Sequence, residues 1–250
     1  MNKKTLLLTG STGFIGHKFL LHALSKNFFV IDILRTKNKN NKKIKQLRKY
    51  YSKSYKNIYF SNYKELSKKL KKTNTDYFIN FATLYNNSHS HNQITNFINS
   101  NITFPTIIYD IINYKTKKMI NFGSMMQHSK NEALTSKNFY AATKNAFEMI
   151  CDYYSNINHK TKFYNIKFYE SIGSYDTRKK LIPTIIDNYK KNKTTKIISR
   201  NLSLNIIHTD DIINSIMILL NNDINSGSYC IKNKHNTKIS NLINFLNKQL

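Results

Sequence analysis

Short apolar runs alternate with longer segments of helical periodicity along the first two thirds of the chain. Five runs predict strands: 5–9, 28–34, 76–82, 118–123 and 163–169. Apolar residues at spacings of three and four predict helices at 14–26, 94–114 and 138–157. Continuous apolar strands separated by helices are typical of a parallel sheet covered on both faces. We therefore expect an α/β fold with a Rossmann-type, doubly wound parallel sheet, which binds ligands at the carboxyl ends of its strands.

The last third of the chain has a less regular pattern. It predicts only short elements: helices near 182–191, 210–220 and 239–246, and strands near 195–199 and 228–231. We expect a dinucleotide-binding domain at 1–170, with the segment near 206–222 packed against it. The remainder, 171–250, is expected to form a small mixed substrate lobe.

The turn after the first predicted strand is rich in glycine. Gly10, Gly13 and Gly16 form a G-x-x-G-x-x-G pattern that leads into the first predicted helix. Gly10 permits a tight turn, Gly13 lets the backbone approach a pyrophosphate, and Gly16 allows the helix to pack closely on the strand. The helix N-terminus adds partial positive charge near the phosphates. An ordinary turn is the alternative for a glycine triplet taken alone. The residues between the glycines are expected to line the same dinucleotide site: Thr12, Phe14 and Ile15.

The end of the second predicted strand favours NADP(H). Folds that bind NAD usually place an acidic residue there, where it accepts a hydrogen bond from the ribose 2′-hydroxyl. Here Leu34 ends the predicted strand, Arg35 follows it, and Asp32 stands two residues too early. A guanidinium suits a 2′-phosphate. NAD(H), selected by Asp32, is the alternative if the strand ends earlier, and Arg35 is then one more surface cation.

Composition and charge narrow the classes of function. The chain has 250 residues, of which 40% are hydrophobic, so it is long and apolar enough to form a full core. The formal net charge of +27 suggests a nucleic-acid partner, but the lysines are scattered and the abundance of Lys, Asn and Ile is typical of an AT-rich coding sequence. We therefore disfavour a nucleic-acid partner. Because no apolar stretch is long enough to span a bilayer, we expect no membrane association either.

The cysteines point to a reducing compartment. Cys151 and Cys230 are the two cysteines of the chain, and they give neither a disulfide framework nor the spacing of metal ligands. We expect a cytoplasmic protein without a metal site.

Three candidate reactive residues lie between the fourth and fifth predicted strands. Tyr140 and Lys144 form a Y-x-x-x-K pattern on a predicted helix, where one turn separates them and both face the same way. The lysine ammonium lowers the cost of a tyrosinate, which suits proton exchange with a carbonyl or alcohol oxygen. Ser124 closes the strand at 118–123, so its hydroxyl is expected at the same edge of the sheet.

These motifs together resemble the extended short-chain dehydrogenase/reductases, the nucleotide-sugar epimerase, dehydratase and reductase family. The resemblance covers nearly the whole chain. It rests on the glycine loop, on 76–82 with Asn80 in place of the usual His, on Asn101 and on 207–211. It implies a catalytic Ser124, Tyr140 and Lys144, with Asn101 supporting Lys144. It also implies a homodimer through the helices near 94–114 and 138–157, and Ala82 in the cofactor site.

A narrower resemblance points to the reductase branch that contains the CDP-abequose synthases. It rests on 124–128, 138–148, 168–173 and 176–183. That branch reduces a 4-keto deoxysugar carried on a nucleotide. By this resemblance the substrate is expected to contact Ser124, Met125, Glu170, Arg178 and Arg200. The two arginines are equally plausible as pyrophosphate contacts and as solvated surface charges.

Two departures from the family inform the chemistry. Sugar dehydratases carry an Asp-Glu pair directly after the catalytic Ser or Thr, whereas this chain has Met125 and Met126, which transfer no protons. Dehydration is therefore disfavoured. Glu170 stands where many epimerases have an Asn, which indicates a different substrate pose.

The sequence therefore predicts NADP(H)-dependent reduction of a 4-keto nucleotide-linked sugar, in surface polysaccharide biosynthesis. The first alternative is a nucleotide-sugar epimerase that retains NAD(P). The second is a nucleic-acid-binding protein on the same fold.

Overall fold

The computed structural model describes residues 3–128, 135–174, 176, 178, 180–197, 199 and 201–249. Its centre is a parallel sheet with seven strands: β1 Thr5–Thr9, β2 Phe29–Arg35, β3 Tyr55–Phe60, β4 Tyr77–Asn80, β5 Lys118–Phe122, β6 Lys162–Lys167 and β10 Gly227–Cys230. Their order in the sheet is β10-β6-β5-β4-β1-β2-β3. Chain order reverses on either side of β1, as in a doubly wound sheet. The expected Rossmann-type α/β fold is confirmed.

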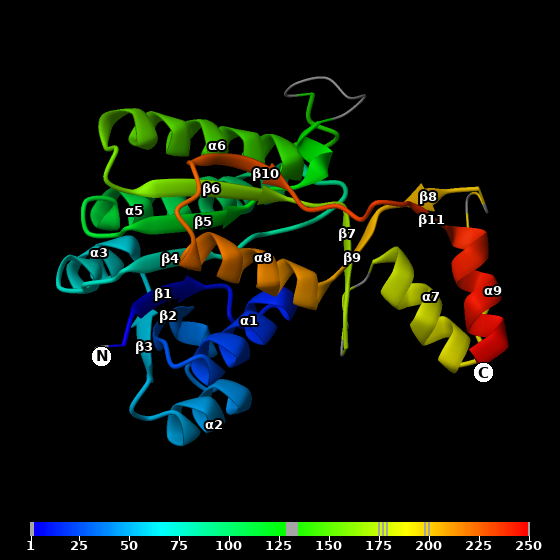
Figure 1. Ribbon diagram of the computed structural model, residues 1–250, viewed down its shortest axis with the longest axis horizontal. Coiled ribbons are helices and arrows are strands. Elements are labelled where there is room, and N and C mark those ends of the chain that lie inside the picture. The colour runs from blue at the N-terminus through cyan, green and yellow to red at the C-terminus, as the bar shows by residue number, and fades with distance from the viewer. Residues whose placement is uncertain are drawn as a thin grey trace.

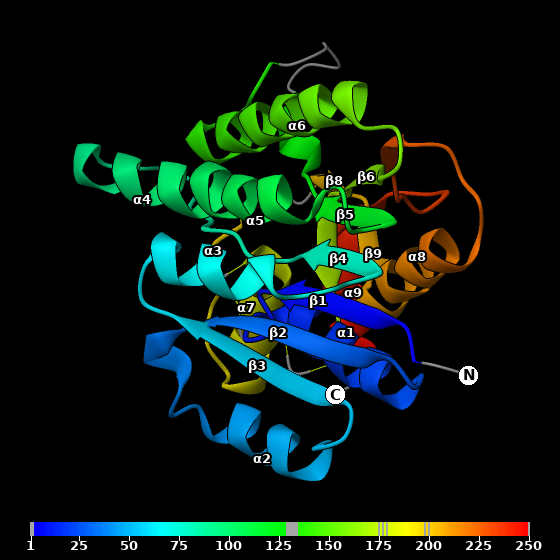
Figure 2. The ribbon, with the colours of Figure 1, turned by 90° about the vertical axis from the view of Figure 1, so that its left-hand side faces the viewer.

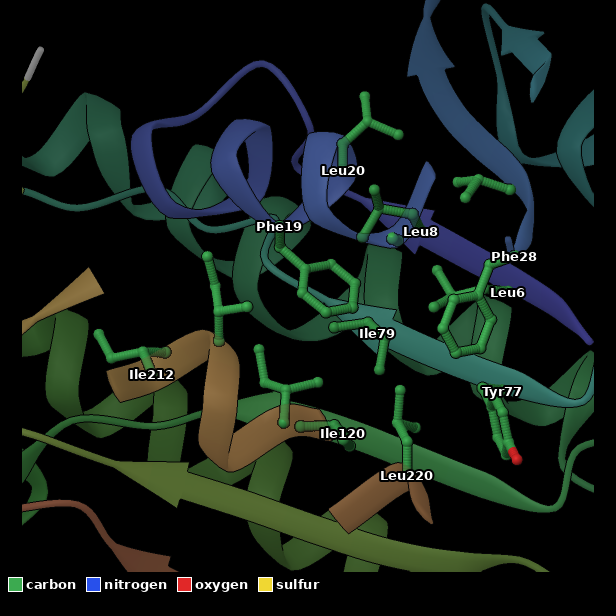
Figure 3. Packing of buried hydrophobic residues seen from close by; sticks show 14 of the residues in the cluster. Leu6, Leu8, Phe19, Leu20, Phe28, Tyr77, Ile79, Ile120, Ile212 and Leu220 are labelled. Carbon is green, nitrogen blue, oxygen red and sulfur yellow. The ribbon is translucent and has the colours of Figure 1, made fainter. Parts of the chain in front are cut away.

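Helices cover both faces of this sheet (Figure 1, Figure 2). One layer consists of α1 Phe14–Ser25, α2 Lys42–Tyr50 and α8 Thr209–Asn221, and the other of α3 Tyr63–Lys71, α5 Phe104–Ile112 and α6 Phe139–Ile157. Because side chains alternate along a strand, Leu6 and Leu8 join the core beneath the first layer while Leu7 joins the core beneath the second. Figure 3 shows the first core, where Phe19 packs among strand residues such as Ile79 and Ile120.

A buried row of polar side chains crosses the sheet within the second core. Thr9, Asn80, Asn121 and Asn165 are paired in register on β1, β4, β5 and β6, and each is at most 1% exposed. The Thr9 hydroxyl donates to Oδ1 of Asn80 at 2.7 Å. The Asn80 amide donates to Asn121, and the Asn121 amide to Asn165, both at 2.9 Å. We call these four residues the polar ladder. It gives Asn80 a structural role in the position where the family has a His.

A smaller unit lies at the carboxyl ends of the strands, on the right of Figure 1. It contains two short strand pairs, β7 Glu170–Ile172 with β9 Ile206–His208 and β8 Ser203–Leu204 with β11 Thr237–Lys238, together with α7 Leu181–Lys190 and α9 Ile239–Gln249. The expected division of the chain differs from the structure in two respects. The segment 206–222, expected to pack with the dinucleotide-binding domain, is divided: α8 packs on the large sheet, but β9 pairs with β7 in the smaller unit. Strand β10 pairs with β6 and so extends the large sheet.

Three local predictions differ from the structure. The expected strand at 195–199 is wrong, because its described residues form no strand and Thr195 is tied back to α7 by a hydrogen bond from Asn188 at 3.0 Å. The expected helix at 94–114 is divided into α4 Ile94–Ile98, a π-helical turn at Asn99–Thr103, and α5. Helices α2 and α3 were not predicted because they are rich in lysine, although Asn41 and Asn62 cap them.

Among the described residues, no helix is long and apolar enough to cross a membrane.

The polar ladder predicts a large loss of stability when its middle member is removed. Replacing Asn121 with Leu leaves the Asn80 amide and the Asn165 carbonyl oxygen buried without partners. Each such group costs about 1–3 kcal/mol, so we expect the free energy of unfolding to fall by about 2–5 kcal/mol. Urea unfolding measures it. Asn156→Leu, at an exposed position of α6, is the matched control. Equal stabilities of the two variants would contradict the structural role of the ladder.

Candidate active site

The glycine loop between β1 and α1 depends on glycine at two positions. Gly10 has φ of +75°, and a Cβ there would lie 2.5 Å from the carbonyl carbon of Phe81. A Cβ on Gly16 would lie 2.3 Å from the carbonyl oxygen of Gly10. A side chain at either position would therefore displace the loop from the end of β4 or from its own helix. The loop meets the N-terminus of α1, which favours negatively charged ligands.

A carboxyl group lies buried beneath this loop. Asp32, in the middle of β2, is 0% exposed. Its Oδ2 accepts hydrogen bonds from the Ser11 hydroxyl of the loop and from the Tyr55 hydroxyl of β3, both at 2.6 Å. Burial raises the pKa of Asp32 to about 7, although both hydrogen bonds act in the opposite direction. Because β2 continues to Arg35, Asp32 lies inside the sheet rather than at the rim where a ribose would bind.

Arg35 ends β2 at the mouth of a groove of about 400 Å³. Its guanidinium is exposed and donates a hydrogen bond to Ser100 at 3.2 Å. The groove also holds other residues that the sequence indicated for the cofactor: Gly10, Thr12, Gly13 and Ala82. Lys37 lines it beside Arg35 and adds a second cation to this end.

A second cavity, of about 300 Å³, adjoins the other side of the glycine loop. It is lined by further residues of the predicted site: Phe14, Ile15, Gly16, Ser124, Tyr140, Lys144 and Arg178. Ser124 follows β5 directly, whereas Tyr140 and Lys144 lie one turn apart on α6. The three residues with reactive side chains therefore share one cavity with the loop.

Burial governs the charge states of the tyrosine and the lysine. The Lys144 ammonium lies 6.0 Å from the centre of the Tyr140 ring, and burial lowers the pKa of Lys144 to about 8. Burial and the neighbouring Tyr85 raise the pKa of Tyr140 above its ordinary value, while a hydrogen bond with Thr83 opposes this shift. The sequence suggested a lowered pKa for this phenol. In the structure burial is the largest influence, and it raises the pKa of Tyr140 instead.

Asn101 lies in the π-helical turn and is 1% exposed. Its amide nitrogen donates to the Leu84 carbonyl oxygen at 3.0 Å and to the Thr143 hydroxyl at 2.9 Å. Its Oδ1 accepts from the Leu84 backbone N–H at 2.7 Å. Asn101 thus ties the loop after β4 to α6 through Thr143, the residue before Lys144.

The predicted substrate residues lie on the side of the smaller unit. Met125 and Glu170 line a further cavity of about 370 Å³ together with Ser124. Glu170 pairs with Lys180 at 3.3 Å. Arg178 lies over the ring of Phe14 at 4.4 Å and pairs with Asp176 at 2.6 Å, so it connects the smaller unit to the glycine loop. The remaining candidate, Arg200, lies outside the described residues.

Sequence reasoning missed several residues that line these cavities. Thr83 and Tyr85 follow β4 and line the cavity of Tyr140, with the Tyr85 ring edge-on to that of Tyr140 at 4.9 Å. Lys180 lines the same cavity, and its ammonium lies 5.4 Å from the centre of the Tyr85 ring. His128 lines the cavity of Met125. The position of 83–85 directly after a buried strand was the signal that would have indicated the first two.

Comparisons with known proteins agree with this geometry. A family model described as the NAD dependent epimerase/dehydratase family matches residues 6–231. A CDP-abequose synthase of Yersinia pseudotuberculosis is 30% identical over 228 residues, which cover 90% of this chain and 75% of that protein. The CDP-abequose synthase of Salmonella typhimurium is 28% identical over 234 residues, which cover 91% of this chain and 73% of that protein.

Solved structures resemble the chain in fold. The crystal structure of UDP-glucuronic acid 4-epimerase from Bacillus cereus in complex with NAD superimposes with a TM-score of 0.81 at 18% identity, covering 98% of this chain and 83% of that one. That of dTDP-glucose 4,6-dehydratase from Bacillus anthracis, also with NAD, gives 0.80 at 17% identity, with 98% and 80% covered. At these identities the likeness establishes the fold alone.

The buried carboxyl of Asp32 predicts a specific dependence of stability on pH. The pKa of Asp32 is about 7 in the folded protein and near 4 in the unfolded chain, so proton binding at Asp32 stabilises the folded state. This stabilisation is complete below pH 4 and is lost as pH rises to 7. Asp32→Asn mimics the protonated form. We expect this variant to gain stability relative to the wild type between pH 4 and 7, by about 4 kcal/mol in all.

Urea unfolding at pH 4.5, 6 and 7.5 measures this difference. Asp187→Asn, at an exposed carboxylate of α7, is the matched control. A difference between Asp32→Asn and the wild type that stays constant with pH would show that Asp32 is ionised throughout.

Proposed function

The chain belongs to the NAD dependent epimerase/dehydratase family, and we propose that it is an NADP(H)-dependent reductase of a 4-keto nucleotide-linked deoxysugar. The observation that carries this proposal is that Ser124, Tyr140 and Lys144 line one cavity with the glycine loop. The CDP-abequose synthases at 24–30% identity over most of the chain support the substrate class. Their names point to a CDP-linked sugar.

The charge states of the site suit reduction. Hydride transfer to the keto carbon is the chemistry that a dihydronicotinamide bound along the glycine loop would supply. Tyr140 is a neutral phenol near pH 7, as an unperturbed tyrosine also is, and it gives its proton to the developing alkoxide oxygen. In this proposal Ser124 donates a hydrogen bond to the same oxygen, and a protonated Lys144 favours the tyrosinate that remains. Asn101 positions this part of α6 through Thr143.

The rim of the cofactor groove supports NADP(H). Leu34 provides no acceptor for a ribose 2′-hydroxyl, whereas Arg35 and Lys37 present two cations at the groove. A guanidinium recognises a phosphate through paired, charge-assisted hydrogen bonds. Asp32, three residues before Arg35, is buried and therefore does not reach this rim.

Two other reactions of the family fit less well. Met125 and Met126 transfer no protons, which disfavours dehydration. An epimerase uses the same three residues and retains its cofactor, and the family description favours it as the second candidate. Net consumption of NADPH separates reduction from epimerisation.

We also propose a homodimer. Met149, Tyr153 and Ile157 lie at four-residue spacing on α6 and are 63%, 60% and 51% exposed. An apolar stripe of this kind on a helix suits burial against a second copy of the same surface.

The reductase proposal predicts NADPH oxidation when the protein is given a CDP-linked 4-keto deoxysugar. Tyr140→Phe removes the proton donor and should lower kcat by about 10²–10⁴-fold. Absorbance of NADPH follows the reaction. Tyr114→Phe, at a 66% exposed tyrosine, is the matched control and should keep full activity. Sugar interconversion without consumption of NADPH would instead identify an epimerase.

The cofactor proposal predicts a selective effect of Arg35→Ala. Loss of a charge-assisted contact should raise the KM for NADPH by about 10- to 100-fold and leave the KM for NADH unchanged. Initial rates with each cofactor measure both constants. Arg48→Ala, at an exposed position of α2, controls for the general loss of positive charge. Equal increases in the KM values for NADPH and NADH would show that Arg35 does not recognise the 2′-phosphate.

A further inference from the structure

A charged cluster outside the redox site lies behind the cavity of Met125 and Glu170. The Lys167 ammonium, at the end of β6, pairs with Glu148 of α6 at 3.0 Å, and the two side chains are 9% and 13% exposed. Gln127 donates to the second oxygen of Glu148 at 2.7 Å, and the Ser228 hydroxyl also donates to this carboxylate. The pair is therefore enclosed and held by neutral donors on two sides.

The same ammonium contacts His128. The Lys167 Nζ lies 2.9 Å from Nε2 of His128. A lysine paired with a carboxylate is charged and has only protons to donate. Nε2 must therefore accept, and a neutral imidazole then carries its proton on Nδ1. Burial, followed by Lys167, lowers the pKa of His128, with Glu148 opposing, so the ring is neutral near pH 7.

His128 reaches the substrate side of the site. Its ring lines the cavity of about 370 Å³ that Ser124 and Met125 also line. Among the described residues, no hydrogen-bond partner is found for its Nδ1. Since Met125 and Met126 offer only apolar contacts, the imidazole N–H is a polar donor on a largely apolar wall.

We propose that His128 is a specificity-determining residue that donates a hydrogen bond from Nδ1 to an oxygen of the substrate sugar. Lys167 and Glu148 are positioning residues, because they fix the tautomer that makes this donation possible. The inference rests on the proposed function, since it takes the bound molecule to be a nucleotide-linked sugar. His128 is not a proton-transfer base, because Lys167 occupies Nε2 and Nδ1 is already protonated.

The charged groups around His128 favour this assignment. Lys167 faces it from β6 and Glu148 from α6, while Lys137 and Glu170 line the same cavity. An imidazolium there would lie against the Lys167 ammonium. A neutral donor matches a sugar hydroxyl or keto oxygen, which are uncharged acceptors.

The first experiment determines the tautomer of the whole protein without substrate. The ¹⁵N chemical shifts of the His128 imidazole identify which nitrogen carries the proton. At pH 7.5 we expect the proton on Nδ1. A proton on Nε2 would overturn the proposal, because Lys167 would then not donate to the ring. This measurement is independent of the reaction that the protein catalyses.

The second experiment measures substrate specificity. His128→Phe keeps a planar ring without a donor, and it should raise the KM for the CDP-linked keto sugar by about tenfold while the KM for NADPH stays constant. His128→Asn restores a donor and should recover most of this loss. His159→Phe, at an exposed histidine beyond α6, is the matched control.

The outcomes separate the two proposals. NADPH oxidation by the wild type tests the reductase activity, and the variants test His128. If His128→Phe behaves like His159→Phe, or if it raises the KM for NADPH as much as that for the sugar, His128 does not contact the sugar. If His128→Asn is no better than His128→Phe, the ring acts by its shape and the assigned hydrogen bond is wrong.

Discussion

The polar ladder is the constraint on which the arrangement of the site depends. Its hydrogen bonds all run in one direction, from Thr9 through Asn80 and Asn121 to Asn165. A shift of one strand by one residue would turn its member to the other face of the sheet and leave buried amides unpaired. The ladder therefore fixes the register of the strands that carry the site. Gly10 and the loop 81–85 directly follow Thr9 and Asn80, whereas Ser124 lies three residues after Asn121 and Lys167 two residues after Asn165.

Helix α6 joins the two halves of the site. Tyr140, Lys144 and Glu148 lie at successive four-residue spacings, so they form one row along the helix. The first two face the cavity next to the glycine loop, and the third holds Lys167 behind the substrate side. Asn101 binds the loop 83–84 to this helix from the π-helical turn. A rotation of α6 would thus disturb both halves together.

Contacts that are local in sequence were the ones that the sequence could predict. Three features each depend on only a few consecutive residues: the glycine loop, the spacing of Tyr140 and Lys144, and the strand that ends before Ser124. The Asp32–Tyr55 and His128–Lys167 contacts join residues that are 23 and 39 positions apart, and no periodicity reports them. Helices α2 and α3 were missed because each buries only one or two residues. Their asparagine caps were the signal available.

The exposure of Arg35 has a consequence for how such a protein can diverge. This side chain is exposed at a strand end, and the hydrogen bond found for it is to the half-buried Ser100, so substituting it disturbs no core. Asp32, three residues earlier, is enclosed by Ser11 and Tyr55, so a substitution there alters the hydrogen bonds beneath the glycine loop. If Arg35 selects the cofactor as proposed, selection acting on cofactor preference can work at the rim alone. The carboxyl beneath the loop stays in place as the rim varies, and descendants of one ancestor can differ in redox partner while sharing an unaltered scaffold.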